Sequence, residues 1–324
     1  MIITRAPLRI TLAGGGTDLP SYSEEFDGEV LSAAINKYVY VSVIQPFDDS
    51  IILKYSNNDK INNINNIKHQ YFKIALKKFK IKKKIEITTL ADIPSGTGLG
   101  SSGSFTVALL KSLNVFKNKK ISTKELVENA SQLEMHDLKM NVGRQDQYIS
   151  AYGGLKNLIF KKNINIVKKI KISHNFEQLI ENNSVLFFTG YTRSASKILK
   201  SQNNLLLEND KEILEKMSLI KKNCIEVKKA IRDSNYDDFC QLINEQWKNK
   251  VSRNKNISNS EINSIIDYGL KKGATAGKLL GAGGGGFILF LTDKKKNLVE
   301  AMTKYKLNPT YFKFDKEGIK TLNC

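Results

Sequence analysis

The amino-acid sequence predicts an α+β fold with two domains. Its 324 residues exceed the roughly 100–200 residues of a typical single domain. Segments with strand and helix patterns are interspersed without the regular alternation of a doubly wound parallel sheet. A charged and less regular stretch spans residues 161–183, so we expect a boundary there and domains of residues 1–170 and 171–324.

β-Branched and aromatic residues mark the strands expected in the first half of the chain. These strands are predicted at residues 2–12, 30–34, 38–44, 50–55 and 85–90. Apolar residues at helical spacing predict helices at residues 67–79, 101–113, 124–139 and 142–151. The stretch between residues 57 and 66 is rich in asparagine and is expected to form a surface loop.

The second half is expected to be richer in helices. A buried strand is predicted at residues 184–189. Helical stretches follow at residues 194–207, 211–232, 236–250 and 260–271. After a glycine run we expect a strand at residues 287–292, one more helix, and a last strand near residues 311–314.

The net charge of the chain bears on whether it binds nucleic acid. The net charge is +19, but the excess lysines are scattered and no nucleic-acid-binding motif accompanies them, so we expect a solvated surface and no specific nucleic-acid partner. A positive field still favours anionic substrates.

No apolar run approaches the ~20 residues that span a bilayer, and the N-terminus resembles a strand rather than a signal peptide, so we expect no membrane partner. Scattered Cys224, Cys240 and Cys324 fit a reducing cytoplasm.

The most informative segment is a glycine-rich loop at residues 94–103, which follows a predicted strand and opens a predicted helix. Glycines let a backbone turn sharply and bring its N–H groups close to an anion. The free N–H groups of the first helical turn, with the helix dipole, favour a bound phosphate. We therefore expect a phosphate group to bind at Pro94, Gly96, Gly98, Leu99, Gly100, Ser101, Ser102 and Gly103.

Two other phosphate-binding motifs compete for this loop. Gly98-x-Gly100-x-x-Gly103 formally matches the dinucleotide fingerprint, and the acidic Glu125 follows about 20 positions later. That fingerprint belongs to a regular βαβ unit, which this segment lacks. The P-loop of NTPases requires Gly-Lys-Ser/Thr after the glycines, and no lysine occupies that place here.

Two further glycine-rich segments lie before and after this phosphate-binding loop in the sequence. The first is the turn Gly14-Gly15-Gly16, followed by Thr17 and Asp18. The Asp18 carboxylate is suited to accept hydrogen bonds from a polyol, or equally to cap the turn. The second is the run 281–286, where glycines before a buried strand imply close approach to either another loop or a ligand.

The three segments together resemble the GHMP kinase superfamily, over nearly the whole chain. In that family the pattern Pro-x-Gly-x-Gly-Leu-Gly-Ser-Ser, present here at residues 94–102, is the ATP phosphate loop. The resemblance implies a ribosomal-protein-S5-like N-terminal domain packed on a ferredoxin-like C-terminal domain. The active site is expected in the cleft between them, with residues 281–286 supporting the phosphate loop.

The same resemblance implies roles for single residues. The segment 142–148 resembles the one that carries the catalytic aspartate, so Asp146 is expected to accept the proton of the attacking hydroxyl. A cation at Arg9 would orient Asp146 and offset developing charge. Glu134 resembles the carboxylate that shares a magnesium ion with a loop serine, here Ser102; the alternative is an exposed helix residue.

Departures from the family pattern bear on the acceptor. Galactokinases have Gly-Glu-His-Thr-Asp where this chain has Gly14-Gly15-Gly16-Thr17-Asp18, so galactose is not expected. Residues 8–20, 143–148 and 189–196 are most similar to members that phosphorylate the C1 hydroxyl of D-glycero-D-manno-heptose 7-phosphate. Substrate contacts are expected from Gly15, Gly16, Thr17, Asp18, Arg144, Arg193, Ser194 and Lys197.

At residues 189–196 a strand end, hydroxyls, Arg193 and a helix start suit a sugar phosphate, although Arg193 in a plain surface turn fits as well. Other acceptors remain open: fucose, an N-acetylhexosamine or an isoprenoid alcohol. A sugar sensor without catalysis is a further alternative. We expect the small molecules ATP, Mg²⁺ and a sugar phosphate as partners, and the sequence leaves a homodimer open.

Overall fold

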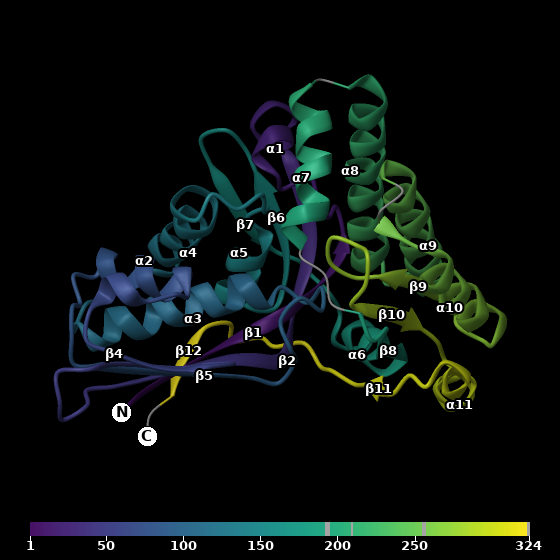
Figure 1. Cartoon of the computed structure of the whole chain (residues 1–324). Helices are drawn as coiled ribbons and strands as arrows, with labels where there is room; N and C mark the ends of the chain where they lie inside the picture. The colour runs from purple at the N-terminus through teal and green to yellow at the C-terminus, as the bar shows by residue number, and fades with distance from the viewer. Residues whose placement is uncertain (192–194, 209, 255–256, 323–324) are drawn as a thin grey trace.

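The computed structural model describes residues 1–191, 195–208, 210–254 and 257–322 (Figure 1). An eight-stranded sheet and a four-stranded sheet, each covered by helices, form the molecule. The predicted α+β class is confirmed, because most strand pairs are antiparallel and the helices do not alternate regularly with strands. The described ends of the chain lie close together beside the larger sheet (Figure 1).

The larger sheet runs in the order β12-β1-β2-β5-β3-β4, and β6 and β7 extend it beside the first part of β2. All its pairings are antiparallel except that of β3 with β5. Its strands are β1 (Ile2–Ala13), β2 (Gly28–Ile44), β3 (Ile51–Lys54), β4 (Asn58–Ile61), β5 (Ile85–Ala91), β6 (Leu155–Phe160), β7 (Asn165–Lys169) and β12 (Lys320–Leu322).

The strands predicted at residues 30–34 and 38–44 form the single strand β2. Its register with β1 shifts between Pro7 and Leu8, which pair with Tyr38 and Ile35 respectively. Proline has no N–H to donate to a neighbouring strand, and a bulge at this point absorbs the residues between Ile35 and Tyr38. The interruption read from the sequence is therefore a bulge within one strand.

Helices cover one face of the larger sheet (Figure 1). They are α2 (Gln70–Lys78), α3 (Ser101–Phe116), α4 (Thr123–Gln132) and α5 (Gln145–Tyr152), with a 3₁₀ turn at Ile64–Asn66. The α3 helix lies against β1 and β2 and is buried along most of its length. A π-helical segment, Leu133–Asp137, follows α4 where the sequence predicted continuous α-helix to residue 139.

The smaller sheet is antiparallel in the order β11-β8-β10-β9. Its strands are β8 (Ser184–Phe188), β9 (Ala276–Leu279), β10 (Phe287–Leu291) and β11 (Pro309–Thr310). The remaining helices are α1 (Pro20–Phe26), α6 (His174–Asn183), α7 (Ala195–Leu207), α8 (Lys211–Arg232), α9 (Tyr236–Arg253), α10 (Ser260–Lys271), α11 (Lys295–Met302) and a 3₁₀ turn at Thr303–Tyr305. Helices α9 and α10 pack on β9, and α7 contacts α1 (Figure 1).

One cluster of buried apolar side chains joins the two sheets. It includes Leu8 and Leu31 from the larger sheet, Leu289 from the smaller one, and Val227 and Phe239 from α8 and α9. Burial of each such side chain contributes about 1.5–3 kcal/mol. The cluster therefore fixes the relative position of the walls between which the site lies.

Several expectations need correction. The stretch predicted as less regular, residues 161–183, contains all of β7 and α6, whose short amphipathic patterns are diluted by lysines and asparagines. The asparagine-rich loop contains β4, because its backbone pairs with β3. No strand covers residues 311–314; β11 ends at Thr310. The chain end returns to the larger sheet as β12, so the first 170 residues alone do not complete that sheet.

Candidate active site

A cavity of about 810 Å³ lies between the phosphate loop, the glycine turn at residues 14–16, the start of α5 and the C-terminal glycine run. Both sheets contribute to its walls, since β1 supplies Arg9 and Thr11 while β9 supplies Lys278. Most of the residues predicted for ATP and substrate thus line one cavity. From the phosphate loop these are Pro94, Gly96, Gly98, Gly100, Ser101, Ser102 and Gly103.

The phosphate loop owes its shape to alternating glycines. Gly96, Gly98 and Gly100 have φ values of 77°, 83° and 77°, a left-handed conformation that side chains disfavour. Gly100 is the N-cap of α3 and has no side chain to occupy the N–H groups of the first turn. Leu99 is buried beneath the loop, and its carbonyl accepts a 2.9 Å hydrogen bond from the Arg9 N–H. The first turn of α3 therefore meets the cavity as an anion-binding end.

The C-terminal glycine run packs directly against the phosphate loop. A Cβ on Gly281 would lie 2.5 Å from the Gly98 Cα, and a Cβ on Gly286 would lie 2.3 Å from the Thr97 carbonyl oxygen. The Phe287 N–H also donates to the Thr97 carbonyl at 3.0 Å. The sequence left open whether the glycines of residues 281–286 approach another loop or a ligand. The structure shows that they pack against the phosphate loop, and parts of the run also line the cavity.

Arg9 and Asp146 form a two-point ion pair beside the loop. Arg9 Nε donates to Asp146 Oδ1 at 2.7 Å and Nη2 donates to Oδ2 at 3.0 Å. Arg9 Nη1 donates to the Gly98 carbonyl at 2.5 Å, so one guanidinium holds both the loop and the carboxylate. Gly103 lets α3 approach α5, because a Cβ there would lie 2.6 Å from the Asp146 Cβ. A quarter of the Asp146 side chain remains exposed toward the cavity.

Glu134 lies in the π-helical segment and is only 1% exposed. Its Oε1 accepts from Thr106 at 2.9 Å, from Tyr71 at 3.1 Å and from Ser102, and its Oε2 accepts from Gln147. Burial raises the pKa of Glu134, and these hydrogen bonds act against that rise. Burial also raises the pKa of Tyr71. The geometry excludes the alternative of an exposed helix residue.

The Glu134–Ser102 pair has the chemistry of a magnesium site. Mg²⁺ binds oxygen ligands and is commonly held by one or two carboxylates together with substrate phosphates. Among the described residues, no group of three or more His, Cys, Asp or Glu side chains is arranged to hold a metal alone. One carboxylate and one hydroxyl beside a phosphate loop therefore fit Mg²⁺ that arrives with a nucleotide.

Asp18 is held deep in the cavity wall. It accepts from the backbone N–H of Gln145 at 3.1 Å, from the Gln145 side chain at 3.1 Å and from the Gly16 N–H at 3.2 Å. Burial raises its pKa, and the neighbouring charge of Asp146 adds to that rise. Asp18 thus caps the glycine turn and also lines the cavity, while its contact with a polyol stays a prediction.

Other predicted substrate residues lie elsewhere. The Thr17 hydroxyl donates to the Gly14 and Glu29 carbonyls inside the protein, and Arg144 pairs with Glu24 at 2.9 Å. Neither residue lines the cavity, so nothing in the structure supports a substrate contact for Thr17 or Arg144. Gly15 and Gly16 do line it. Arg193 and Ser194 fall outside the described residues, and Lys197 is described only as a backbone position of α7.

Sequence reasoning missed three buried cations in the cavity wall: Lys250 and Arg253 on α9, and Lys278 on β9. Burial lowers the pKa of Lys278 to about 7 and that of Arg253 to about 10, and it also lowers the pKa of Lys250. Local patterns could not reveal them, because each lies in an ordinary amphipathic helix or a short strand. Only the packing of α9 and β9 against β1 turns them toward the cavity.

Aromatic side chains line another part of the cavity near the phosphate loop. Tyr55, His69 and Phe105 belong to one cluster, with ring centroids 4.9 Å apart for Tyr55 and His69 and 5.9 Å apart for His69 and Phe105. Leu90 lines the same region and is 68% exposed. This wall offers apolar and aromatic surface for a planar ring.

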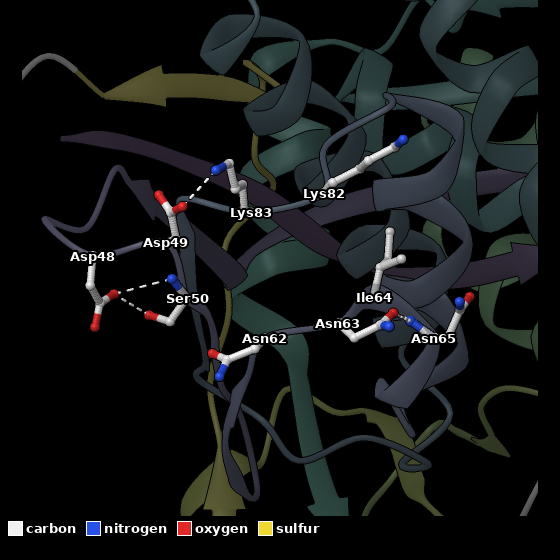
Figure 2. A pocket seen from close by; sticks show the side chains of 9 residues that line it. All are labelled: Asp48, Asp49, Ser50, Asn62, Asn63, Ile64, Asn65, Lys82 and Lys83. Carbon is white, nitrogen blue, oxygen red and sulfur yellow. Dashed lines mark hydrogen bonds and ion pairs between the residues drawn. The ribbon is translucent and has the colours of Figure 1, made fainter.

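A second pocket, of about 640 Å³, lies at the connection between β2 and β3 (Figure 2). Asp48, Asp49, Lys82 and Lys83 line it, and the Lys83–Asp49 ion pair at 2.5 Å is more than half exposed. None of the predicted site residues lines this pocket. Asp48 pairs with Lys60 and Asp49 with Lys83 at this surface, and the candidate site is the cavity between the sheets, where the predicted residues gather.

Comparison with known proteins agrees with this geometry. Family models match twice: GHMP kinases N terminal domain over residues 66–154, and GHMP kinases C terminal over residues 227–307. A Campylobacter jejuni protein described as D-glycero-alpha-D-manno-heptose 7-phosphate kinase is 32% identical over 99% of this chain and 98% of its own length. A Methanocaldococcus jannaschii mevalonate kinase is 25% identical over 100% of this chain and 99% of its length.

Among solved structures, a D-glycero-D-manno-heptose 1-phosphate kinase from Bacteroides thetaiotaomicron is similar with a TM-score of 0.82 and 25% identity, covering 100% of this chain and 99% of that one. The matches confirm the expected α+β fold, with a ribosomal-protein-S5-like N-terminal domain and a ferredoxin-like C-terminal domain. Among the described residues, no helix is long and apolar enough to cross a membrane.

Proposed function

The chain belongs to the GHMP kinases and is a small-molecule kinase, and from this premise we propose that it transfers the γ-phosphate of ATP to the anomeric C1 hydroxyl of D-glycero-D-manno-heptose 7-phosphate. The product would be the 1,7-bisphosphate, an intermediate for GDP-heptose synthesis. The observation that carries this proposal is the two-point pair of Arg9 and Asp146, which lies where the phosphate loop meets the remainder of the cavity.

We assign the proton transfer to Asp146. As the acceptor oxygen bonds to the γ-phosphorus and ADP leaves, the hydroxyl proton passes to the Asp146 carboxylate. Arg9 holds that carboxylate at two points, which fixes the direction of its lone pairs. The same guanidinium adds positive charge next to the loop, where negative charge is transferred.

We assign the nucleotide phosphates to the loop and the first turn of α3, where uncapped N–H groups face the cavity. Glu134 and Ser102 would hold Mg²⁺, which supplies charge neutralisation for the phosphates when bound. The aromatic wall with Tyr55, His69 and Phe105 is our proposal for the adenine subsite, because it is apolar and adjoins the loop.

The acceptor assignment rests on similarity and on charge. The relatives that cover the whole chain include proteins named for heptose 7-phosphate and for heptose 1-phosphate, both of which are phosphorylated seven-carbon sugars. Asp18, with its carboxylate at the cavity wall, is suited to bind sugar hydroxyls. Arg253, whose pKa of about 10 keeps it charged at neutral pH, adds positive charge to this part of the cavity, as a phosphorylated acceptor requires.

Another acceptor is the second candidate, since a mevalonate kinase also matches the whole chain. An ADP-release assay with heptose 7-phosphate, heptose 1-phosphate, heptose, fucose, N-acetylhexosamines and mevalonate separates the two. We expect kcat/KM for heptose 7-phosphate to exceed every other value at least tenfold, with NMR placing the new phosphate on C1. A higher value for an unphosphorylated acceptor would refute the assignment, and the absence of ADP release with every acceptor would point to a non-catalytic homologue.

A further inference from the structure

Arg253, the last residue of α9, is a cation buried in the cavity wall and only 7% exposed. Its Nη1 donates to the Gly15 carbonyl at 3.2 Å and approaches the Met217 sulfur at 3.4 Å. Its Nε is shielded from solvent and has no hydrogen-bond partner among the described residues. No carboxylate of the described chain lies within ion-pair distance of this guanidinium.

The glycine turn makes room for this side chain. A Cβ on Gly16 would lie 2.5 Å from Arg253 Nη1, and the φ of Gly16 is +97°. A side chain at position 16 would therefore displace the guanidinium. The turn at residues 14–16 lacks the Glu and His that galactokinases have there. Part of the space beside it is occupied by Arg253 from α9, a helix that packs on the smaller sheet.

Arg253 differs from the other cations in the same wall. Arg9 is paired with Asp146. The Lys250 ammonium donates to the Leu279 and Gly281 carbonyls, and the Lys278 ammonium donates to two β1 carbonyls and to Gln246. Arg253 donates to one backbone carbonyl, that of Gly15, and feels the charge of Asp18, but its buried Nε has no partner among the described residues. A bound anion could take this free N–H and would therefore stabilise the guanidinium.

A series of neighbouring residues in the cavity wall connects Asp146 with Asp18 and Arg253. Asp146 is next in sequence to Gln145, whose side chain and backbone donate to Asp18. Asp18 in turn accepts from the Gly16 N–H, and Arg253 lies against Gly15 and Gly16. Asp146, Asp18 and Arg253 are therefore connected through Gln145 and the glycine turn, and all three line the same cavity.

We propose that Arg253 binds the phosphate that the sugar acceptor already carries, at the end of the cavity opposite the reacting hydroxyl. The planar guanidinium matches the oxygens of a phosphate monoester and can donate two parallel hydrogen bonds to it. This assignment rests on the proposed function in that the acceptor is phosphorylated. The predicted contacts of Arg193, Ser194 and Lys197 with that phosphate stay a prediction, and the proposal adds Arg253 as the residue that distinguishes phosphorylated from unphosphorylated sugars.

The test compares Arg253→Met, Arg253→Lys and the wild type on heptose 7-phosphate and on heptose. We expect Arg253→Met to raise KM for heptose 7-phosphate about 10- to 100-fold, with kcat changed less than threefold and KM for ATP unchanged. Its kcat/KM for unphosphorylated heptose should fall by less than about threefold, so that the loss falls mainly on the phosphorylated sugar. Arg253→Lys, which keeps the charge, should recover part of the loss and serves as the second variant if the methionine variant does not fold.

Lys248→Met is the matched control, because Lys248 is an exposed cation on the same helix. An equal loss on both sugars in Arg253→Met would show a structural role and overturn the proposal. Loss of discrimination in Arg193→Gln, with none in the Arg253 variants, would overturn it as well.

Binding of inorganic phosphate separates this proposal from the proposed function. With the phosphate loop saturated by a non-hydrolysable ATP analogue, calorimetry should detect inorganic phosphate binding to the wild type and at least tenfold weaker binding to Arg253→Met. If heptose 7-phosphate is no substrate but this difference appears, the named acceptor is wrong and the subsite stands. Equal phosphate binding in both proteins would overturn the subsite.

Discussion

Arg9 and Asp146, which lie 137 positions apart in the sequence, face each other with hydrogen bonds of 2.7 and 3.0 Å. The same guanidinium reaches the Gly98 carbonyl of the phosphate loop. One strand residue therefore sets the position of the proposed base relative to the loop. This relationship is the basis of the first two predictions.

Asp146→Asn should lower kcat by about 10²–10⁴, because the amide keeps the shape of the side chain but cannot take the hydroxyl proton. Nucleotide affinity, measured by calorimetry, should stay within threefold of the wild type. Turnover within tenfold of the wild type would show that Asp146 is not the base.

Arg9→Lys should lower kcat by about 10–100-fold, since an ammonium cannot span both carboxylate oxygens and the Gly98 carbonyl as the planar fork does. Arg5→Lys is the matched control: Arg5 lies on the same strand and pairs with Glu317 at the surface. Single-turnover kinetics with saturating ATP would measure the chemical step, and equal rates for the two variants would contradict the role given to Arg9.

Glu134→Gln should weaken divalent-metal binding in the presence of a non-hydrolysable ATP analogue by at least tenfold, because the site loses its carboxylate charge. The variant should still fold. The buried Gln147 Oε1 has no partner, and a flip of that amide would let it accept from the new side-chain amide. Electron paramagnetic resonance of bound Mn²⁺ measures the affinity directly, and an unchanged affinity would place the metal elsewhere.

Gly281→Ala should raise KM for ATP and lower the melting temperature, since the added Cβ would lie 2.5 Å from the Gly98 Cα and push the phosphate loop away. Gly154→Ala is the matched control. The φ of Gly154 is +68°, close to the +71° of Gly281, but its nearest neighbour is 3.7 Å from the added Cβ. Both variants therefore have the same backbone strain, but only Gly281→Ala adds a steric clash with the phosphate loop. Equal KM values for ATP in the two variants would mean that residues 281–286 do not support the phosphate loop.

Cys224 and Cys240 should resist alkylation in the native protein. Both are buried, and burial raises the pKa of Cys224 to about 12 and that of Cys240 to about 11, from a usual value of 9.0. At pH 8 the thiolate fraction, which is the reactive form, falls by about two to three orders of magnitude. Mass spectrometry after iodoacetamide treatment of a Cys324→Ser protein should show no fast labelling when native and two labels when unfolded in guanidinium; rapid native labelling would contradict the burial.

Several features follow from local sequence alone. The helices at residues 211–232 and 260–271 have the predicted bounds, because long amphipathic patterns with capping residues leave little freedom. Short elements in lysine- and asparagine-rich stretches, such as β7 and α6, were not predicted, since their few apolar positions become meaningful only against a partner sheet. The π-helical segment that carries Glu134 was likewise missed, because it continues the apolar pattern of α4.

The sequence by itself determined the phosphate loop, since alternating glycines before a helix are a property of the local backbone. It also determined the family, because these motifs recur in order along the chain. Only the tertiary structure decided that Arg9 forms an ion pair with Asp146. It also decided that Gly281 packs on Gly98 and that Arg253 occupies the space beside Gly16. Such contacts join segments up to hundreds of residues apart, so they depend on how the two sheets share a core and not on any local preference.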